Sequence, residues 1–253
     1  MTTHVISDAL PLPESGEGAT ACPVGALTCE ERGELFALLD RHFDGVDPAQ
    51  FAHDLGEKDW VLRIRRDGRL VGFTTLQLYD DSCDGARLNV IYSGDTIVAP
   101  EAWGSPVLAR GWIALVRALQ ATRPGERWAW LLLSSGFRTY RFLPVFWRDF
   151  SPRYDGSALE DDALRTRLAR ARFGAAFDEE AGVVRFAHPQ RLRGPLSSVP
   201  SGRKDDPHVR FFLARNPGHA AGDELVCLTT LSDDNLTTAG KRMVRAGLSC
   251  GGC

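Results

Sequence analysis

The sequence predicts an α/β protein in which helices surround an antiparallel meander of strands. A capping box at Thr28 and Glu31 opens an apolar run with helical spacing. From Asp59 onward the apolar residues alternate with polar ones, which is typical of strands with one buried face. The mostly apolar stretch 127–133 follows an amphipathic helix, as expected of a strand covered on both faces.

Two helices are predicted before the first strand. The first spans about 29–42 and begins at the capping box. The second is short and begins at Asp47-Pro48, where an N-cap residue precedes proline at the first helical position.

Three strands then form the meander. The first, 60–65, turns at Asp67-Gly68 into the second, 70–79, because this dipeptide favours a tight hairpin. The third covers 87–98, and Gly94 within it predicts a bulge or a close approach of another chain segment.

A helix, a strand and a short helix follow the meander. Ser105-Pro106 predicts the start of the helix, which ends before 123–125. The strand 127–133 comes next, and the short helix begins at Ser134 and reaches about Leu143.

The C-terminal part predicts further mixed structure. Its segments are a helix at 159–172, a strand at 182–186, a Pro-, Gly- and Ser-rich link at 188–202, a helix at 206–215, a strand at 224–231 and a helix at 233–245. The link is either a surface excursion or a hinge, and composition does not decide between them.

Composition limits the classes of function. The chain has 253 residues, a net charge of −3, 43% apolar and 25% charged residues, an ordinary globular balance that excludes a disordered or collagen-like protein. The slightly acidic charge argues against a nucleic-acid binder. No apolar stretch is long enough to span a membrane.

Residues 1–27 are rich in Pro, Gly and Glu and are expected to form a flexible leader rather than a secretory signal. Six cysteines are too sparse for a disulfide framework, so a reduced, cytoplasmic protein is expected. The histidines show no metal-ligand spacing, and no metal is expected. Cys250 and Cys253 form either a mobile tail or a functional thiol pair.

The loop 99–105 is the first candidate binding site. A strand that passes through a Gly-containing turn directly into a helix presents free backbone N–H groups and the positive end of the helix dipole. A pyrophosphate fits such a site. The alternative is that Gly104 and the prolines serve only the turn.

The order of elements around this loop resembles the GNAT superfamily of N-acetyltransferases. In the loop, Glu101, Gly104 and Pro106 stand at the positions of that family's phosphate-binding motif, and Gly104 matches it. The resemblance implies a mixed, mostly antiparallel central sheet flanked by helices, with a C-terminal α+β extension. It places an acyltransferase core at 28–150. The residues that follow are expected to form an α+β part at 151–245, which either completes or extends that core or forms a second acyltransferase-like half, and then a mobile tail at 246–253.

By resemblance, the backbone of this loop holds the pyrophosphate of coenzyme A. The residues expected to bind the donor are Ile97, Val98, Trp103, Gly104, Ser105 and Val107. Glu101 is acidic and Pro106 lacks an N–H, which are departures from the family pattern. These departures favour a divergent member of the family that binds its donor differently, the donor being either a larger acyl-CoA or an acyl group on a carrier protein.

Acyl transfer to an amine needs a base, an acid for the leaving thiolate and donors for the oxyanion. The resemblance makes Tyr140 the candidate acid, with aromatic packing as the alternative. Asp95, a carboxylate within an apolar strand, is the candidate base, unless it faces water at an edge. Backbone amides between Gly94 and Val98 are the candidate oxyanion donors.

Aromatic residues and arginines alternate through 137–150. They predict either an apolar tunnel for a long acyl chain with a basic rim or core packing with snorkelling arginines. The hypothesis is therefore an N-acyltransferase that moves an acyl group from acyl-CoA or an acyl-carrier protein to a small amine, an amino acid or a peptide by direct attack. The competing hypothesis is a non-catalytic binding or regulatory protein that keeps the fold.

Overall fold

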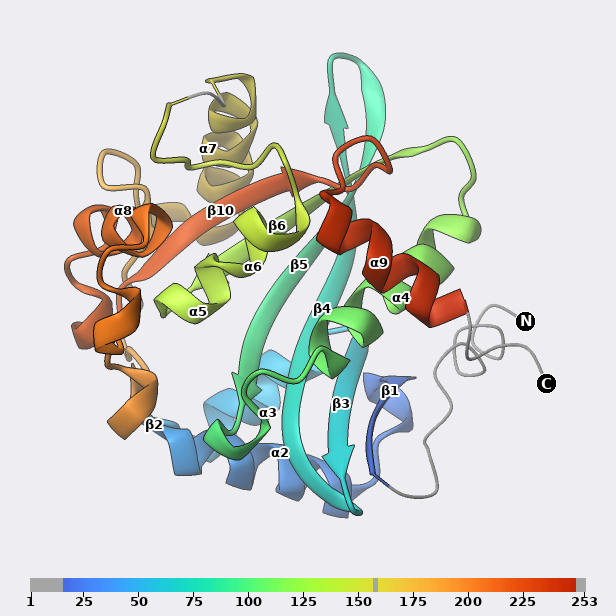
Figure 1. Ribbon diagram of the computed structural model, residues 1–253, viewed down its shortest axis with the longest axis vertical. Helices are drawn as coiled ribbons and strands as arrows, with labels where there is room; N and C mark the ends of the chain where they lie inside the picture. The colour runs from blue at the N-terminus through green and yellow to red at the C-terminus, as the bar shows by residue number, and fades with distance from the viewer. Residues whose placement is uncertain (1–15, 157–158, 249–253) are drawn as a thin grey trace.

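The computed structural model describes residues 16–156 and 159–248, without the side chains of 159–161 and 246–248. Its centre is an eight-stranded sheet in the order β1-β3-β4-β5-β6-β10-β8-β7 (Figure 1). The strands are β1 (Glu17–Pro23), β3 (Trp60–Arg66), β4 (Arg69–Cys83), β5 (Ala86–Val98), β6 (Arg127–Ser134), β7 (Phe177–Asp178), β8 (Val183–Val184) and β10 (Glu224–Thr230). Neighbouring strands are antiparallel except β5 and β6, which are parallel. The predicted mixed, mostly antiparallel sheet is confirmed.

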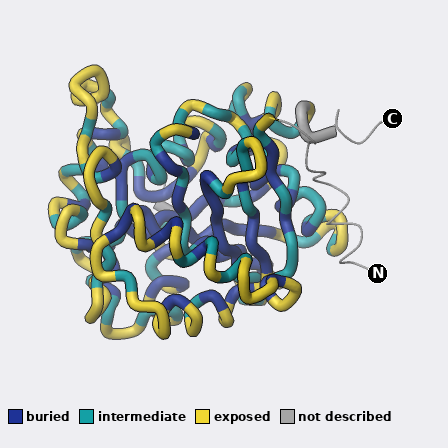
Figure 2. Tube along the Cα trace, turned by 90° about the horizontal axis from the view of Figure 1, so that it is seen from below, coloured by how far each residue is buried: buried dark blue, intermediate teal, exposed yellow. Residues whose placement is uncertain are grey.

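Helices cover both faces of the sheet. One face carries α2 (Cys29–His42), α3 (Pro48–Gly56) and α7 (Leu159–Phe173). The other carries α4 (Val107–Ala121), α5 (Phe137–Tyr140), α6 (Phe142–Phe146) and α9 (Thr238–Leu248), which lie in front of the sheet in Figure 1, and α8 (Pro207–Arg215) packs near α5. The buried residues gather in the sheet and on the helix faces turned toward it, while the outer turns are exposed (Figure 2).

The N-terminal caps predicted for α2 and α3 are present as hydrogen bonds. The Thr28 hydroxyl accepts from the Glu31 N–H at 3.2 Å and the Glu31 carboxylate accepts from the Thr28 N–H at 2.9 Å, which completes the capping box of α2. Asp47 caps α3 by accepting from the Gln50 N–H at 2.7 Å. Both predicted helix starts are therefore confirmed.

The β3–β4 hairpin turns at Asp67 and Gly68, whose φ angles of 48° and 79° both lie in the left-handed region that such a tight turn requires. Further along, the register between β4 and β5 shifts so that Gly94 and Asp95 together oppose Thr75. This is the bulge predicted at Gly94. It tilts the end of β5 away from the line of the strand.

Strands β5 and β6 separate just after this bulge. Their parallel ladder runs from Leu88 and Arg127 to Ser93 and Leu132, while β5 continues to Val98 against β4 alone. The sheet therefore opens between the ends of two parallel strands at its centre.

The C-terminal part completes the same sheet rather than forming a second half. Strand β10 pairs with β6, and β8 and β7 extend the sheet beyond it. The link 188–202 contains β9 (Arg191–Leu192), which pairs with β2 (Phe43–Asp44). The link is thus tied to the N-terminal helices.

Two expectations for the ends of the chain need correction. Residues 17–26 do not belong to a flexible leader, because β1 pairs with β3 along its whole length and buries Ala19 and Ala21 against α4. At the other end, α9 runs to Leu248 and so includes the first three residues of the stretch expected to form a tail. Residues 1–15, Cys250 and Cys253 lie outside the described part.

Among the described residues, none of the helices combines the length and the apolar character that crossing a membrane requires. In that same part of the chain, no three His, Cys, Asp or Glu side chains lie close enough together to hold a metal ion.

Candidate functional site

Two cavities meet where β5 and β6 separate. Cavity A has a volume of about 830 Å³ and lies on the face of α3 and α7. Cavity B has a volume of about 650 Å³ and lies between the start of α4 and the helices α5 and α6. Four residues line both cavities, namely Phe43, Thr96, Ser135 and Thr139, and the last three, which carry hydroxyl groups, are called the junction here. The two cavities therefore share a wall, at the opening in the sheet, that carries three hydroxyl groups.

The start of α4 forms one end of cavity B. The Ser105 hydroxyl accepts from the Val107 N–H at 3.2 Å, and the Pro106 carbonyl accepts from the Arg110 N–H at 2.9 Å. The N–H groups of Leu108 and Ala109 meet no acceptor among the described residues. Unpaired amides at a helix start, together with the helix dipole, attract an anion.

The loop before α4 is held by its own side chains and backbone. The Trp103 indole donates to the Val98 carbonyl at 3.0 Å, and Gly104 takes a φ of +85°, a conformation that favours glycine. The loop thus presents its backbone to cavity B in a fixed shape.

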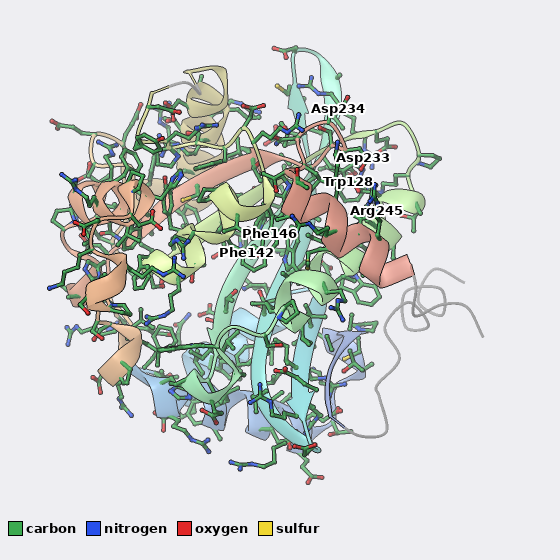
Figure 3. All side chains as sticks on the ribbon, in the orientation of Figure 1. Trp128, Phe142, Phe146, Asp233, Asp234 and Arg245 are labelled. Atoms are coloured by element: carbon green, nitrogen blue, oxygen red, sulfur yellow. The ribbon has the colours of Figure 1, made fainter. Side chains whose placement is uncertain are left out.

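Aromatic rings form the deeper wall of cavity B. Trp112 and Trp130 lie with ring centroids 4.1 Å apart. Phe142 and Phe146, labelled in Figure 3, lie along α6 with ring centroids 4.8 Å apart. The Arg138 guanidinium lies 3.8 Å from the centre of the Trp103 ring and donates to the Leu196 carbonyl at 3.1 Å. Cavity B therefore suits a ligand that joins an apolar part to an anionic part.

Asp95 lies in cavity A at the bulge of β5. Its partial burial raises the pKa of its carboxyl, and the charge of Lys58 opposes this rise. Lys58 is only 8% exposed, and its ammonium donates to the Asp54 carbonyl at 2.8 Å. A Cβ on Gly94 would lie 2.9 Å from the Lys58 Cε, so the glycine leaves the space that Lys58 occupies.

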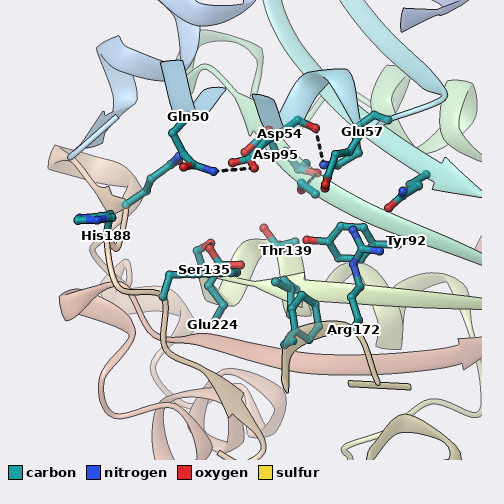
Figure 4. A pocket seen from close by; sticks show the side chains of 18 of the residues that line it. Gln50, Asp54, Glu57, Tyr92, Asp95, Ser135, Thr139, Arg172, His188 and Glu224 are labelled. Carbon is teal, nitrogen blue, oxygen red and sulfur yellow. Dashed lines mark hydrogen bonds between the residues drawn. The ribbon is translucent and has the colours of Figure 1, made fainter. Parts of the chain in front are cut away.

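Glu224 lies across cavity A from Asp95 (Figure 4). It begins β10, and its carboxylate accepts from the Ser135 hydroxyl at 3.0 Å. Burial raises the pKa of Glu224 to about 7, the Ser135 hydrogen bond opposes the rise, and the charge of Asp95 adds to it. A carboxyl with such a pKa can take up and release a proton near neutral pH.

The residues predicted to bind the donor lie mostly in cavity B. Five of them line it, namely Ile97, Val98, Trp103, Gly104 and Ser105, whereas Val107 is not part of its lining. Pro106 lines the cavity but Glu101 does not; the Glu101 carbonyl instead accepts from Arg66 at 2.6 Å.

Tyr140 is placed away from both cavities. It is 0% exposed, lines neither cavity, and its hydroxyl donates to the Pro152 carbonyl at 2.9 Å. Burial also raises the pKa of this hydroxyl far above its usual range. The role of acid predicted for Tyr140 therefore finds no geometric support, and the alternative of aromatic packing accounts for its contacts.

The aromatic stretch 137–150 divides between cavity and core. Phe137, Phe142 and Phe146 line cavity B, whereas Trp147 and Phe150 are buried in the core. Arg138 and Arg141 also line cavity B, and Arg148 does not. The apolar tunnel predicted from the sequence therefore agrees with the first part of this stretch, and the core packing predicted as its alternative agrees with the second part.

Sequence reasoning missed Glu224, Ser135, Thr139 and Arg172. Ser135 follows a strongly apolar strand within Ser134-Ser135-Gly136, which is the one local signal that marked a polar strand end. Glu224 stands 89 residues from Ser135 in the chain, and only the pairing of β10 with β6 brings them together.

No protein-family model matches the chain, and the curated proteins contain no significant match. Over about half of the chain and at low sequence identity, the structure is similar to solved structures described as N-acyltransferases and as a GNAT family N-acetyltransferase. A conserved protein from Enterococcus faecalis V583, described as a probable N-acyltransferase, is 14% identical, with a TM-score of 0.42 and coverage of 54% of this chain and 33% of its own.

Two other similar structures come from enzymes. An acyl-CoA N-acyltransferase from Pseudomonas aeruginosa is 18% identical over 46% of this chain and 78% of its own, with a TM-score of 0.34. A GNAT family N-acetyltransferase from Escherichia coli, in complex with CoA, is 21% identical over 52% of this chain and 70% of its own, with a TM-score of 0.35. The present chain thus spans about a third of the Enterococcus protein and most of the other two.

Proposed function

We propose that the protein transfers an acyl group from a pantetheine thioester bound in cavity B to an amine bound in cavity A. The observation that carries this proposal is the junction, where two cavities on opposite faces of the sheet meet between separated parallel strands. Cavity B offers unpaired helix-start amides and cavity A offers half-buried carboxylates. Each side therefore suits one of the two reactants.

The donor would place its phosphates at the start of α4 and its thioester at the junction. The amides of Leu108 and Ala109 would bind the anion, and the end of β5 at Ile97 and Val98 would run beside the pantetheine. The aromatic wall leaves apolar space near this path, which supports a medium or long acyl chain on CoA or a carrier protein.

In the reaction, the amine nitrogen attacks the thioester carbonyl, the C–N bond forms and the C–S bond breaks. The amine proton must leave, and the thiolate must gain one. Glu224 would accept the amine proton, while the Ser135 hydroxyl gives its proton to the sulfur and recovers one from Glu224. The net result is the transfer of one proton from nitrogen to sulfur.

The other polar groups would support this step. Asp95, the base expected from the sequence, would bind the acceptor as its ammonium and pass that first proton to solvent, which leaves the neutral amine to attack beside Glu224. Backbone amides between Gly94 and Val98 and the junction hydroxyls would stabilise the oxyanion. No covalent enzyme intermediate is needed.

The experiment measures melting temperature and free thiol release with CoA, acetyl-CoA, octanoyl-CoA, palmitoyl-CoA and an acyl-carrier protein. A ligand at about 100 times its Kd stabilises the folded state by about 2.7 kcal/mol, which raises the melting temperature by several degrees. We expect stabilisation by at least one of these donors and thiol release when a panel of amines is added. Stabilisation without thiol release would support the non-catalytic alternative, and no stabilisation by any donor would overturn the proposal.

A matched pair of variants at Leu108 tests the anion site. Leu108→Glu and Leu108→Gln have nearly the same size and differ in charge, and Leu108 is half-buried in the wall of cavity B. The glutamate would repel the donor phosphates, so its Kd for CoA should exceed that of the glutamine variant by about tenfold or more. Equal Kd values would place the phosphates elsewhere.

A further inference from the structure

Arg172 is a cation in the wall of cavity A. It lies on α7, and its guanidinium carbon is 3.8 Å from the centre of the Tyr92 ring and 5.8 Å from that of Tyr79. The two rings hold the guanidinium plane in position. Its Nε is buried and has no hydrogen-bond acceptor among the described residues.

The other arginines of α7 have carboxylate partners. Arg165 pairs with Asp162, Arg167 with Asp81 and Arg170 with Glu179. Within the described part of the chain, Arg172 forms no such ion pair. A partly buried guanidinium without a counter-ion, at the wall of a large cavity, is a site for an anionic group of a ligand.

Tyr79 adds a second donor at the same end of the cavity. Its hydroxyl is buried and has no hydrogen-bond partner among the residues described. Burial raises the pKa of Tyr79 to about 12, so the hydroxyl keeps its proton at neutral pH. A neutral phenol beside a guanidinium suits a carboxylate, because both groups donate and carboxylate oxygens only accept.

Negatively charged side chains lie further along cavity A from Arg172. Figure 4 shows Arg172 beneath Tyr92 at one end, Gln50 and His188 at the other, and Asp95, Thr139, Ser135 and Glu224 between them. The cavity thus places Asp95 and Glu224 near the junction and Arg172, which has no ion-pair partner among the described residues, beyond them. Of the other carboxylates in its lining, Asp81 pairs with Arg167, Glu57 lies 3.8 Å from His53 and Asp54 accepts from Gln50. A polyamine would satisfy the carboxylates but would bring a positive charge against Arg172.

We propose that the acceptor is an amino acid, with its amine at the junction and its carboxylate held by Arg172 and Tyr79. This inference rests on the proposed function, in which cavity A takes the amine. It narrows the acceptor from amines in general to small molecules that carry an amine and a carboxylate together.

Isothermal titration tests it by comparing the twenty standard amino acids with amines that lack the carboxyl group, such as tryptamine, tyramine and cadaverine. We expect at least one amino acid to bind, and to bind about tenfold or more tightly than its decarboxylated counterpart, because a charge-assisted pair is lost. The titrations are made with and without CoA. The inference is overturned if no amino acid binds or if the decarboxylated amines bind as tightly.

Variants on α7 then locate the carboxylate. Arg172→Met keeps much of the apolar stem and should weaken amino-acid binding by about tenfold or more, while removing the difference between an amino acid and its amine. Arg172→Lys keeps the positive charge but lacks the planar guanidinium, so its affinity for the amino acid should lie between those of the wild type and Arg172→Met. Arg170→Met, two residues earlier in the same helix, is the control and should bind like the wild type.

Unchanged binding by a folded Arg172→Met protein would also overturn the inference. If that variant fails to fold, the titrations of the wild-type protein with amino acids and with their decarboxylated amines still test the inference. Failure of the proposed function appears separately, as a lack of donor binding and thiol release, because titration without CoA reports on cavity A alone.

Discussion

Ser135 donates a hydrogen bond to Glu224 at 3.0 Å, across the boundary between β6 and β10, at the point where the two cavities meet. The serine reaches both cavities, whereas the glutamate lines only cavity A. The pair therefore offers a route for a proton from one side of the sheet to the other.

Replacement of Glu224 by glutamine should remove the base and keep the hydrogen bond from Ser135. Because general bases contribute about 10²- to 10⁴-fold to a rate, kcat/KM should fall by that order. In the wild type, kcat/KM should rise with pH through a midpoint near the pKa of about 7, since the base acts only when ionised. The variant should lack this rise, as measured by thiol release between pH 5 and 9.

Glu180→Gln is the matched control for this change, because Glu180 is exposed in the turn before β8. Its pH profile should match that of the wild type. A Glu224→Gln enzyme with the wild-type profile would assign the base to Asp95, which Asp95→Asn would then reveal.

The same Glu224→Gln substitution should alter stability in a pH-dependent way. The pKa of Glu224 rises from 4.5 to about 7 on folding, so the folded state binds the proton more tightly and loses stability as the pH increases through this window. At pH 8 the variant should be more stable by about 1–3 kcal/mol, and at pH 4 the two proteins should be equal. Urea unfolding at both pH values measures this, and equal stability at pH 8 would contradict it.

Tyr140→Phe should affect stability more than turnover. It removes the hydrogen bond to the Pro152 carbonyl in a buried site, at a cost of about 1–2 kcal/mol. Since Tyr140 lines neither cavity, kcat should stay within about twofold of the wild type. Thermal melting and steady-state kinetics check both effects. A loss of kcat of about 100-fold in a folded variant would restore Tyr140 as the acid.

Arg138→Met should weaken donor binding. The methionine keeps apolar contact with Trp103 but removes the positive charge from the wall of cavity B. The Kd for CoA should rise by about tenfold, and its dependence on salt should decrease. Titration with CoA at low and high salt measures this.

Arg148→Met removes a charge from the same stretch outside the cavity and serves as the control. If the Kd for CoA rises equally in both variants, the effect comes from the net charge of the protein and not from a contact at cavity B.

The sequence predicted those features of the fold that depend on neighbours in the chain. The capping box at Thr28, the turn at Asp67-Gly68 and the bulge at Gly94 are each determined by a few adjacent residues. Strand β1 was missed because its seven residues include glycine and proline, and its pairing with β3 joins segments about 40 residues apart.

The candidate site was less predictable because it joins distant segments. The helix that carries Tyr140 was expected, but the direction of this side chain depends on Phe211 and Phe212 of α8, whose rings pack against it at 6.0 and 5.8 Å. Likewise, Glu224 and Arg172 both line cavity A only through the order of strands in the sheet and the packing of α7. No local pattern contains that information.

With β10 added to the sheet, the residues proposed to bind the thioester and some of those proposed to act on the amine come from different parts of the chain. Glu224 and Arg172 both follow residue 150, whereas the loop and the helix start that would hold the thioester precede it. Under the proposed function, substitutions of Glu224 or Arg172 would therefore change how the amine is bound or deprotonated while the start of α4 stays the same. A shortened protein that ends at about residue 150 would keep the start of α4, Asp95 and Tyr79 but would lack Glu224 and Arg172, the proposed base and the proposed carboxylate-binding cation.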